Sequence, residues 1–106
     1  MIPLELQTPA EILEEIAERA RALRLERGWS QAELARRAGI NVETLRRFER
    51  TGKIALERLV MLAVVLGAVQ PLGQLFPRPP VRTLDDLERR DALPKRAPRK
   101  RRSPGA

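Results

Sequence analysis

The 106-residue chain contains neither cysteine nor histidine, and this double absence removes most of the usual chemistry of active sites and metal sites. Without cysteine there is no disulfide and no thiolate ligand for a metal. Without histidine, the commonest metal ligand and the commonest general base are both missing. The remaining hydroxyl groups do not lie in a nucleophile motif. We therefore expect no catalysis, no metal site and no cofactor.

Aromatic residues and long apolar runs are also scarce. Because the aromatic residues are only Trp29, Phe48 and Phe76, the core has to be built from aliphatic side chains, which favours packed helices over a β-sandwich. The longest apolar run, Leu59 to Val69, is too short for a bilayer, which takes about 20 residues. No signal peptide is recognisable after Met1. We expect an all-α, cytoplasmic protein with no membrane partner.

Acidic residues are absent from segment 94–106, so the charge of the chain is unevenly placed. Residues 1–93 carry 15 basic and 14 acidic side chains, a net charge of +1, whereas residues 94–106 carry six basic ones, a net charge of +6. With no core-forming pattern from residue 91 onward, we expect a disordered polybasic tail at 91–106. Such a tail either contacts phosphate groups of a nucleic acid or only keeps the protein in solution.

Helix-capping signals divide the rest of the chain into short helices. Thr8 and Glu11 form a capping box, which predicts a helix from Pro9 to about Arg27, and Gly28 ends it. In the N-terminal extension, residues 1–8, apolar residues alternate with others, which is a weak signal for a strand. The stripe of the first helix that is expected to face the core consists of Ile12, Ile16, Ala20 and Leu23.

Further helical segments are expected along the chain. Two of them begin with strong signals, a capping box at Ser30 and Glu33 and an N-cap at Asn41. Prolines at 77, 79 and 80 mark a linker, so we expect a folded domain at 1–76 and a linker with a short helix at 77–90. The expected segments are Ser30 to about Gly39, Val42 to about Arg50, Ile54 to Leu66, Pro71 to Phe76 (a turn or a helix) and Thr83 to about Arg90.

Residues 30–50 have the layout of a helix-turn-helix. Two short capped helices meet across a tight turn that contains Gly39, and Ala35 is small where the helices approach each other. Ile40 and Leu45 have the spacing to fill the space between them. Arginine can donate two hydrogen bonds to guanine in the major groove, so the motif indicates a DNA-reading helix, or else an αα-hairpin with solvated charges. The outer face of the second helix is expected to carry Val42, Glu43, Arg46 and Arg47.

Residues 21–68 resemble the Xre family, the Cro and phage-repressor class of helix-turn-helix. The resemblance implies a five-helix repressor-type domain that binds double-stranded DNA, usually as a homodimer. The apolar helix 54–66 offers a surface for the second copy, unless the first helix and residues 83–90 cover it within one chain. The residues that carry the resemblance are Leu23-Arg24, Ser30-Gln31-x-Glu33-Leu34-Ala35, Gly39-Ile40, Phe48-Glu49, Gly52-Lys53 and the leucines of the helix that follows.

The resemblance also implies roles for single residues. Gln31 is similar to a family glutamine that contacts a phosphate and steadies the recognition helix. Asn41 matches a position that often touches phosphate, and simple helix capping accounts for it equally well. Arg24 and Glu49 match an ion pair that ties the first helix to the end of the recognition helix, which is a structural role.

On the recognition helix, Arg46 is the leading candidate for a base contact and Arg47 for a phosphate contact. Glu43 departs from the glutamine or serine common at its position. It either accepts a hydrogen bond from cytosine N4 or pairs with Arg47 at i,i+4. The candidate DNA-binding residues are Gln31, Asn41, Val42, Glu43, Arg46, Arg47 and Lys53.

The segments Thr8-Pro9 and Gly28-Trp29-Ser30-Gln31 also look like those of the HipB-like antitoxins, which partner a HipA-like kinase toxin and repress their own operon. The expected function is a sequence-specific, autoregulatory transcriptional repressor at the bacterial nucleoid that reads the major groove with helix 42–50. One alternative is an antitoxin that mainly holds a HipA-like kinase toxin. Another is a protein that binds nucleic acids without sequence preference through its basic tail.

Overall fold

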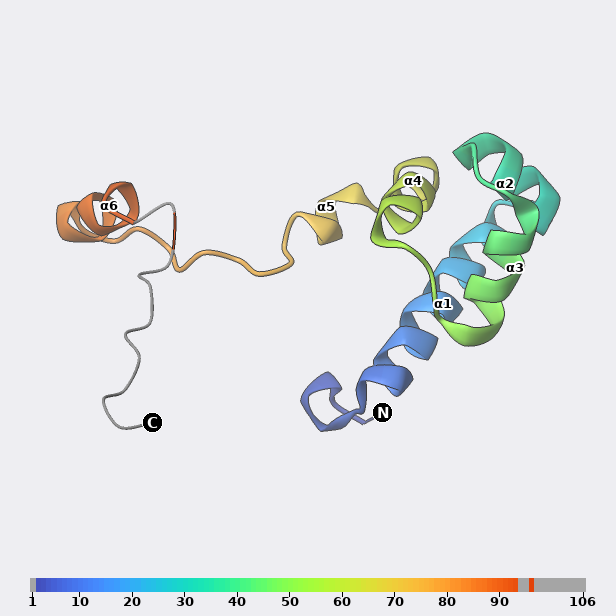
Figure 1. Cartoon of the computed structure of the whole chain (residues 1–106), viewed down its shortest axis with the longest axis horizontal. Helices are drawn as coiled ribbons and strands as arrows, with labels where there is room; N and C mark the ends of the chain where they lie inside the picture. The colour runs from blue at the N-terminus through green and yellow to red at the C-terminus, as the bar shows by residue number, and fades with distance from the viewer. Residues whose placement is uncertain (1, 94–95, 97–106) are drawn as a thin grey trace, which may run out of the picture. The chain divides into compact units, whose positions relative to one another are not determined.

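The computed structural model describes residues 2–93 and 96, and within this range every regular element is a helix (Figure 1). This confirms the predicted all-α class. The chain divides into two compact units, Met1–Phe76 and Pro77–Ala106. The prediction of a disordered tail falls largely on residues that lie outside the described range, 94, 95 and 97–106. The elements are the 3-10 helix η1 Leu4–Leu6 and the α-helices α1 Pro9–Glu26, α2 Gln31–Ala38, α3 Val42–Thr51, α4 Leu56–Leu66, α5 Val69–Leu72 and α6 Leu84–Asp91.

Helix α1 begins at Pro9, as its capping signal predicts. The Thr8 hydroxyl accepts a hydrogen bond from the Glu11 N–H at 3.2 Å and donates one to the Glu11 carboxylate at 3.0 Å. The carboxylate thus meets the hydroxyl and not the Thr8 N–H that a full capping box would use. The helix ends at Glu26, one residue earlier than expected, and Gly28 follows with a left-handed backbone.

The N-terminal extension is not a strand, so that prediction is wrong. Residues Leu4–Leu6 form η1, in which the Leu6 N–H donates to the Pro3 carbonyl at 3.0 Å. The Gln7 side chain closes the segment by donating to the Ile2 carbonyl at 2.8 Å. A strand needs a neighbouring strand for its backbone hydrogen bonds, and the described residues contain none. The polar backbone groups are therefore satisfied locally.

The core lies where α1, α2, α3 and α4 meet, with α3 running alongside α1 (Figure 1). Helix α1 contributes Ala17, whose small side chain lets its neighbours approach closely. The stripe predicted for α1 flanks Ala17 and is only half-buried, with Ile16, Ala20 and Leu23 packed against the core. The largest fully buried side chains, all from α2, α3 and α4, are Leu34, Leu45, Phe48 and Leu62.

The C-terminal end of α3 rests directly on the backbone of α1. Gly52, the C-cap of α3, is buried and has a φ of +79°, a conformation that side chains with a Cβ adopt only at a cost. A Cβ at this position would lie 2.6 Å from the carbonyl carbon of Leu13 and 2.7 Å from its oxygen. Two features therefore require glycine at this position, the positive φ and the close approach to the Leu13 backbone. The contact fixes α3 against α1.

The two helices after α3 differ from their predicted bounds. Helix α4 begins at Leu56 and not at Ile54, because Ala55 has an extended backbone at the N-cap and offers no side-chain cap. Ile54 still packs against the core. Helix α5, Val69–Leu72, begins and ends earlier than the predicted segment, and the chain then turns until Phe76, which has a positive φ of 51°. No helix among the described residues is long and apolar enough to cross a membrane.

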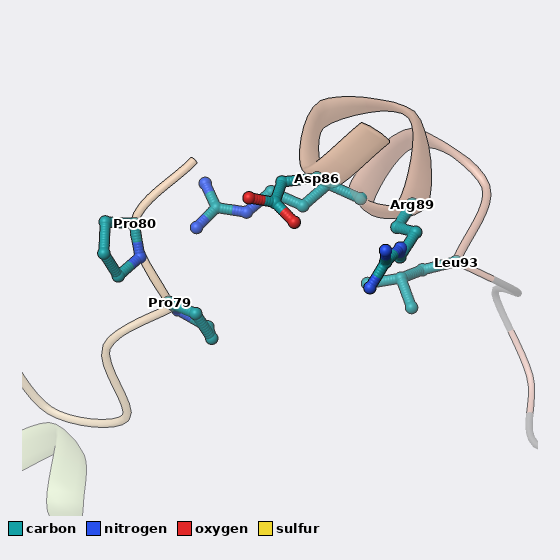
Figure 2. A pocket seen from close by; sticks show the side chains of 6 residues that line it. Pro79, Pro80, Asp86, Arg89 and Leu93 are labelled. Carbon is teal, nitrogen blue, oxygen red and sulfur yellow. The ribbon is translucent and has the colours of Figure 1, made fainter. Parts of the chain in front are cut away.

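The second unit contains α6, which begins where its cap predicts and ends at Asp91. The Thr83 hydroxyl accepts a hydrogen bond from the Asp86 N–H at 3.1 Å, and the Arg82 N–H donates to Asp86 Oδ2 at 3.2 Å. Figure 2 shows Pro79 and Pro80 on the extended segment, opposite side chains of α6. Together they line an open depression of ≈ 320 Å³. Since Asp91 is helical, the predicted tail begins at the earliest after it.

Candidate nucleic-acid interface

Helix α2 is held at both ends by local hydrogen bonds. The Ser30 hydroxyl accepts from the Glu33 N–H at 3.1 Å, as half of the predicted capping box. The other half is absent, because the Glu33 carboxylate binds Arg36 at 2.7 Å and Arg37 at 2.8 Å. The hydrogen bond from Arg36 holds the pKa of Glu33 below its ordinary value. At the other end, Gly39 has a φ of 73° and lets the chain turn sharply toward α3.

Helix α3 begins at Val42, and Asn41 caps it as predicted. Asn41 Oδ1 accepts a hydrogen bond from the Glu43 N–H at 2.7 Å, so the side-chain oxygen is used within the protein. Leu45 and Phe48 are fully buried and anchor one face of the helix in the core. The opposite face is therefore turned outward with a defined orientation. The short turn between α2 and α3 completes the layout of a helix-turn-helix.

A buried ion pair ties α3 to α1. Arg24 donates from Nε to Glu49 Oε2 at 2.9 Å and from Nη2 to Glu49 Oε1 at 2.8 Å, and their side chains are only 8% and 5% exposed. Arg24 also donates from Nη1 to the Trp29 carbonyl at 2.8 Å. The ion pair expected from the family resemblance is thus present, with two parallel hydrogen bonds that fix its geometry.

Gln31, the first residue of α2, joins the same network. Its Nε2 donates to Glu49 Oε1 at 3.3 Å, so one carboxylate holds both α1 and the start of α2. Gln31 therefore steadies the recognition helix through a direct contact. The contact of Gln31 with a DNA phosphate remains a prediction.

The outward face of α3 and Gln31 enclose an open, polar depression of ≈ 530 Å³. Its α3 residues lie at i, i+3, i+4 and i+7, which is one face of a helix. Four of the predicted site residues meet here, and Arg50 joins them although it was not predicted. The helical spacing from Glu43 was the signal that could have found it. The lining residues are Gln31, Glu43, Arg46, Arg47 and Arg50.

Two predictions about this face need correction. Glu43 pairs with Arg46 at i,i+3 and not with Arg47 at i,i+4, although both positions adjoin it on the helix surface. Val42 does not lie on the outer face. It is half-buried and packs against the core, since it precedes the buried Leu45 by three residues and shares its side of α3.

The remaining predicted residues lie outside the depression. Asn41 is exposed at the start of α3, and Lys53 is exposed just after its C-cap, Gly52. The Lys53 backbone N–H donates to Thr51 Oγ1 at 3.1 Å. Both residues are thus placed at the two ends of the recognition helix.

A second cluster, around the Trp29 ring, helps to hold α2. The Trp29 ring lies against two guanidinium groups, with Arg37 Cζ 4.4 Å and Arg27 Cζ 5.2 Å from its centroid. Arg27 also donates from Nη2 to the Leu66 carbonyl at 3.0 Å, which links the end of α1 to the end of α4. The helices that support the interface are therefore held together by two sets of contacts, one around Glu49 and one around Trp29.

The fold and this face define a DNA-binding helix-turn-helix domain. The family model described as Helix-turn-helix matches residues 21–73, half of the chain, from the second half of α1 through α5. The chain belongs to this family, of the Xre type, and is a DNA-binding helix-turn-helix regulator. None of the curated proteins compared with the chain matches it.

Proposed function

We propose that the protein is a sequence-specific transcriptional repressor that reads the major groove with α3. The observation that carries the proposal is the depression in which Glu43, Arg46, Arg47 and Arg50 face outward beside Gln31. Long arginine side chains on a helix that is anchored from behind combine reach with a fixed register, and both are needed to recognise base edges. The proposed operator lies before the protein's own gene, which makes the repressor autoregulatory.

We assign base reading to Arg46. Contacts with the phosphates of the DNA backbone are assigned to Arg47, Gln31, Asn41 and Lys53. Arg46 donates two hydrogen bonds to the O6 and N7 atoms of a guanine. The other contacts hold phosphates and set the register of the protein on the duplex, without carrying sequence information directly. We assign no base contact to Val42, because its side chain is half-buried and packs against the core.

Glu43 forms an ion pair with Arg46, and from this position it can serve the interface in two ways. As a positioning residue it holds the Arg46 guanidinium ready for guanine. As a reading residue it accepts a hydrogen bond from cytosine N4. A carboxylate beside a guanidinium presents an acceptor next to donors, which complements the donor and the two acceptors on the major-groove edge of one C·G pair. We favour the reading role for this complementarity.

The proposal of sequence-specific binding is tested by selection of duplexes from a random pool with the full-length protein. Enrichment of one motif, and binding to it that survives excess random duplex, is the expected result. Recovery of no motif would show that the protein binds nucleic acid without sequence choice. The selected motif can then be placed before the protein's own gene and tested for repression of a reporter.

The two roles of Glu43 are separated with modified bases in the selected duplex. N4-methylcytosine keeps its pairing with guanine but replaces the major-groove hydrogen of the amine by a methyl group. If Glu43 reads cytosine, this base weakens binding by the wild-type protein and has a much smaller effect on Glu43→Ala. If Glu43 only positions Arg46, the methyl group has the same effect on both proteins.

We further propose that the repressor binds as a homodimer through α4. Leu56, Val60 and Val64 follow one another at i, i+4 and i+8 along this helix, and they are 68%, 41% and 60% exposed. Such an apolar ridge is unfavourable in water, and a second copy of the same ridge would cover it. Two copies would place their recognition helices on two half-sites, about 34–36 Å or one helical turn of DNA apart.

An antitoxin is the second candidate function, and the unit after residue 76 is what favours it. Its helix α6 exposes Leu84 and Leu87, and Leu93 follows exposed beyond the helix. This unit lies outside the region that the family model matches. We assign its exposed apolar side chains to a protein partner. The partner proposed here is a HipA-like kinase toxin. Neutralisation of that toxin by co-expressed protein, retained in Arg46→Ala, would support a holding role that is independent of base reading.

A further inference from the structure

Arg21 on α1 carries a positive charge that the protein itself hardly uses. It lies one turn before Arg24, and its side chain is 59% exposed. Its ion contact is long, with Nε 4.0 Å from Glu49 Oε1. The Glu49 carboxylate is already bound on both oxygens by Arg24, at 2.9 Å and 2.8 Å. The single negative charge of Glu49 is therefore balanced by Arg24, and the charge of Arg21 is left over.

Arg21 lies close to Gln31, because both side chains approach the same carboxylate oxygen of Glu49. Glu49 Oε1 lies near Arg21 Nε and also accepts the hydrogen bond from Gln31 Nε2 at 3.3 Å. Gln31 in turn lines the depression on the outward face of α3. Arg21 thus stands at the edge of the proposed DNA interface, at the place where α1, α2 and the end of α3 come together.

We propose that Arg21 binds a phosphate of the DNA backbone beside Gln31, so that α1 supplies a third element of the interface. The inference rests on the proposed function, because it needs α3 to lie in the groove. An exposed guanidinium gains more from two charge-assisted hydrogen bonds to a phosphate than from a distant carboxylate that is already paired. Glu49 pairs with Arg24 and so stabilises the fold, whereas the Arg21 guanidinium remains able to bind a DNA phosphate.

The same helix offers a matched control for Arg21. Arg19 has the same charge, and its side chain is 60% exposed, practically the same as that of Arg21. Its guanidinium is paired with Glu15 at 2.7 Å, one turn earlier on α1. Two residues along a helix turn the side chain through more than a right angle, so Arg19 points away from the side that Arg21 and Arg24 share. Removal of either arginine changes the net charge by the same amount.

The test is a salt titration of DNA binding by the full-length wild type, Arg21→Ala, Arg21→Lys and Arg19→Ala, on the selected duplex and on a random duplex. Each phosphate contact contributes about 0.9 to the slope of log affinity against log salt. We expect Arg21→Ala to lose about this much for each Arg21 in the complex, on both duplexes. Arg21→Lys should keep most of the slope, and Arg19→Ala should keep all of it.

A duplex with single neutral methylphosphonate linkages then locates the contact. One position in each half-site should weaken the wild type, and the same position should not weaken Arg21→Ala further. Equal slopes for Arg21→Ala and Arg19→Ala would overturn the proposal. A melting temperature of Arg21→Ala below that of Arg19→Ala, with the DNA slope unchanged, would do so as well. Because the random duplex reports phosphate contacts by itself, loss of the sequence preference would count against the proposed function and not against Arg21.

Discussion

Arg24 and Glu49 form a bidentate ion pair between α1 and α3 that is almost completely withdrawn from water. Three elements depend on it, since Arg24 also holds the Trp29 carbonyl and Glu49 also holds Gln31. One carboxylate therefore joins the recognition helix to both α1 and the start of α2. Breaking such a pair from one side leaves the other charge buried without a partner.

Glu49→Ala should destabilise the fold and not merely weaken DNA binding. The buried Arg24 guanidinium would lose both of its carboxylate bonds, and the loss of one partner of a buried pair costs about 3–5 kcal/mol. The measurement is the free energy of unfolding in denaturant. Glu57→Ala is the control, because Glu57 is exposed on α4 and its contact with Arg58 is long, at 3.9 Å. Equal stability of the two variants would reject the structural role of the pair.

Gly52→Ala should be far more damaging than Gly28→Ala, although both glycines have a positive φ, of +79° and +70°. A Cβ at position 28 meets nothing within 4 Å, so that variant bears only the left-handed strain of about 1–2 kcal/mol. At position 52 the Cβ would overlap the Leu13 backbone, which adds about 1–3 kcal/mol of overpacking. Thermal unfolding of the two variants compares them directly, and similar melting temperatures would contradict the close approach of α3 to α1.

Arg46→Ala should lower the affinity for the selected operator by about 1–3 kcal/mol and relax the preference at one base pair. Binding to random duplex should fall less, because a base contact contributes little there. Arg47→Ala is the comparison, with a similar loss expected on both duplexes as for a phosphate contact. The affinities of both variants for the operator and for the random duplex distinguish a base contact from a phosphate contact. An equal loss on the two duplexes for Arg46→Ala would reassign it to the backbone.

Val64→Glu should shift the protein from dimer to monomer without unfolding it. Val64 is exposed at the C-terminal end of the apolar ridge of α4, so a charged side chain is tolerated in the monomer but is costly once buried between two copies. Sedimentation measures the mass of the particle, and circular dichroism verifies that the helices persist. Arg58→Glu, on the same helix, is the control. A wild-type protein that sediments as a monomer at every concentration would reject the dimer.

Helix starts were predictable from the sequence because single side chains set them. Thr8, Ser30, Asn41 and Thr83 each accept the backbone hydrogen bond that their position predicts. The starts of α4 and α5 were misplaced, and their N-caps, Ala55 and Ala68, make no side-chain hydrogen bond. A capping hydrogen bond joins residues only two or three positions apart, so it can be predicted from the sequence without knowledge of the fold. Where no side chain caps, the start depends on tertiary packing.

The pairing of charges was less predictable. On a helix surface both i+3 and i+4 adjoin a given residue, so spacing alone could not decide between Arg46 and Arg47 as the partner of Glu43. Val42 was misplaced for a related reason, since its burial depends on how α3 is rotated against the core. Arg50 was overlooked although it lies at i+7 from Glu43 on the same face of α3, and its place beside Gln31 depends on the fold.

Deleting residues 94–106 should weaken DNA binding in a salt-dependent manner and leave the base preference intact. The segment carries a net charge of +6, and residues 1–93 carry only +1. If two or three of these charges contact phosphates, the slope of log affinity against log salt should fall by about 2–3. The ratio of operator to random affinity should persist, because phosphate contacts carry no direct sequence information. Salt titrations of both proteins on both duplexes provide the measurement.

A variant with the six basic residues of segment 94–106 changed to glutamine separates charge from chain length. It keeps the length of the segment and removes its charge, so it should behave as the deletion does if phosphate contacts are the cause. Unfolding curves of the wild type and of both variants should coincide, since the folded units would be unchanged. If the salt slopes of wild type and variants run parallel, the segment does not engage phosphate. It would then act as a solubilising segment or as a contact for another partner.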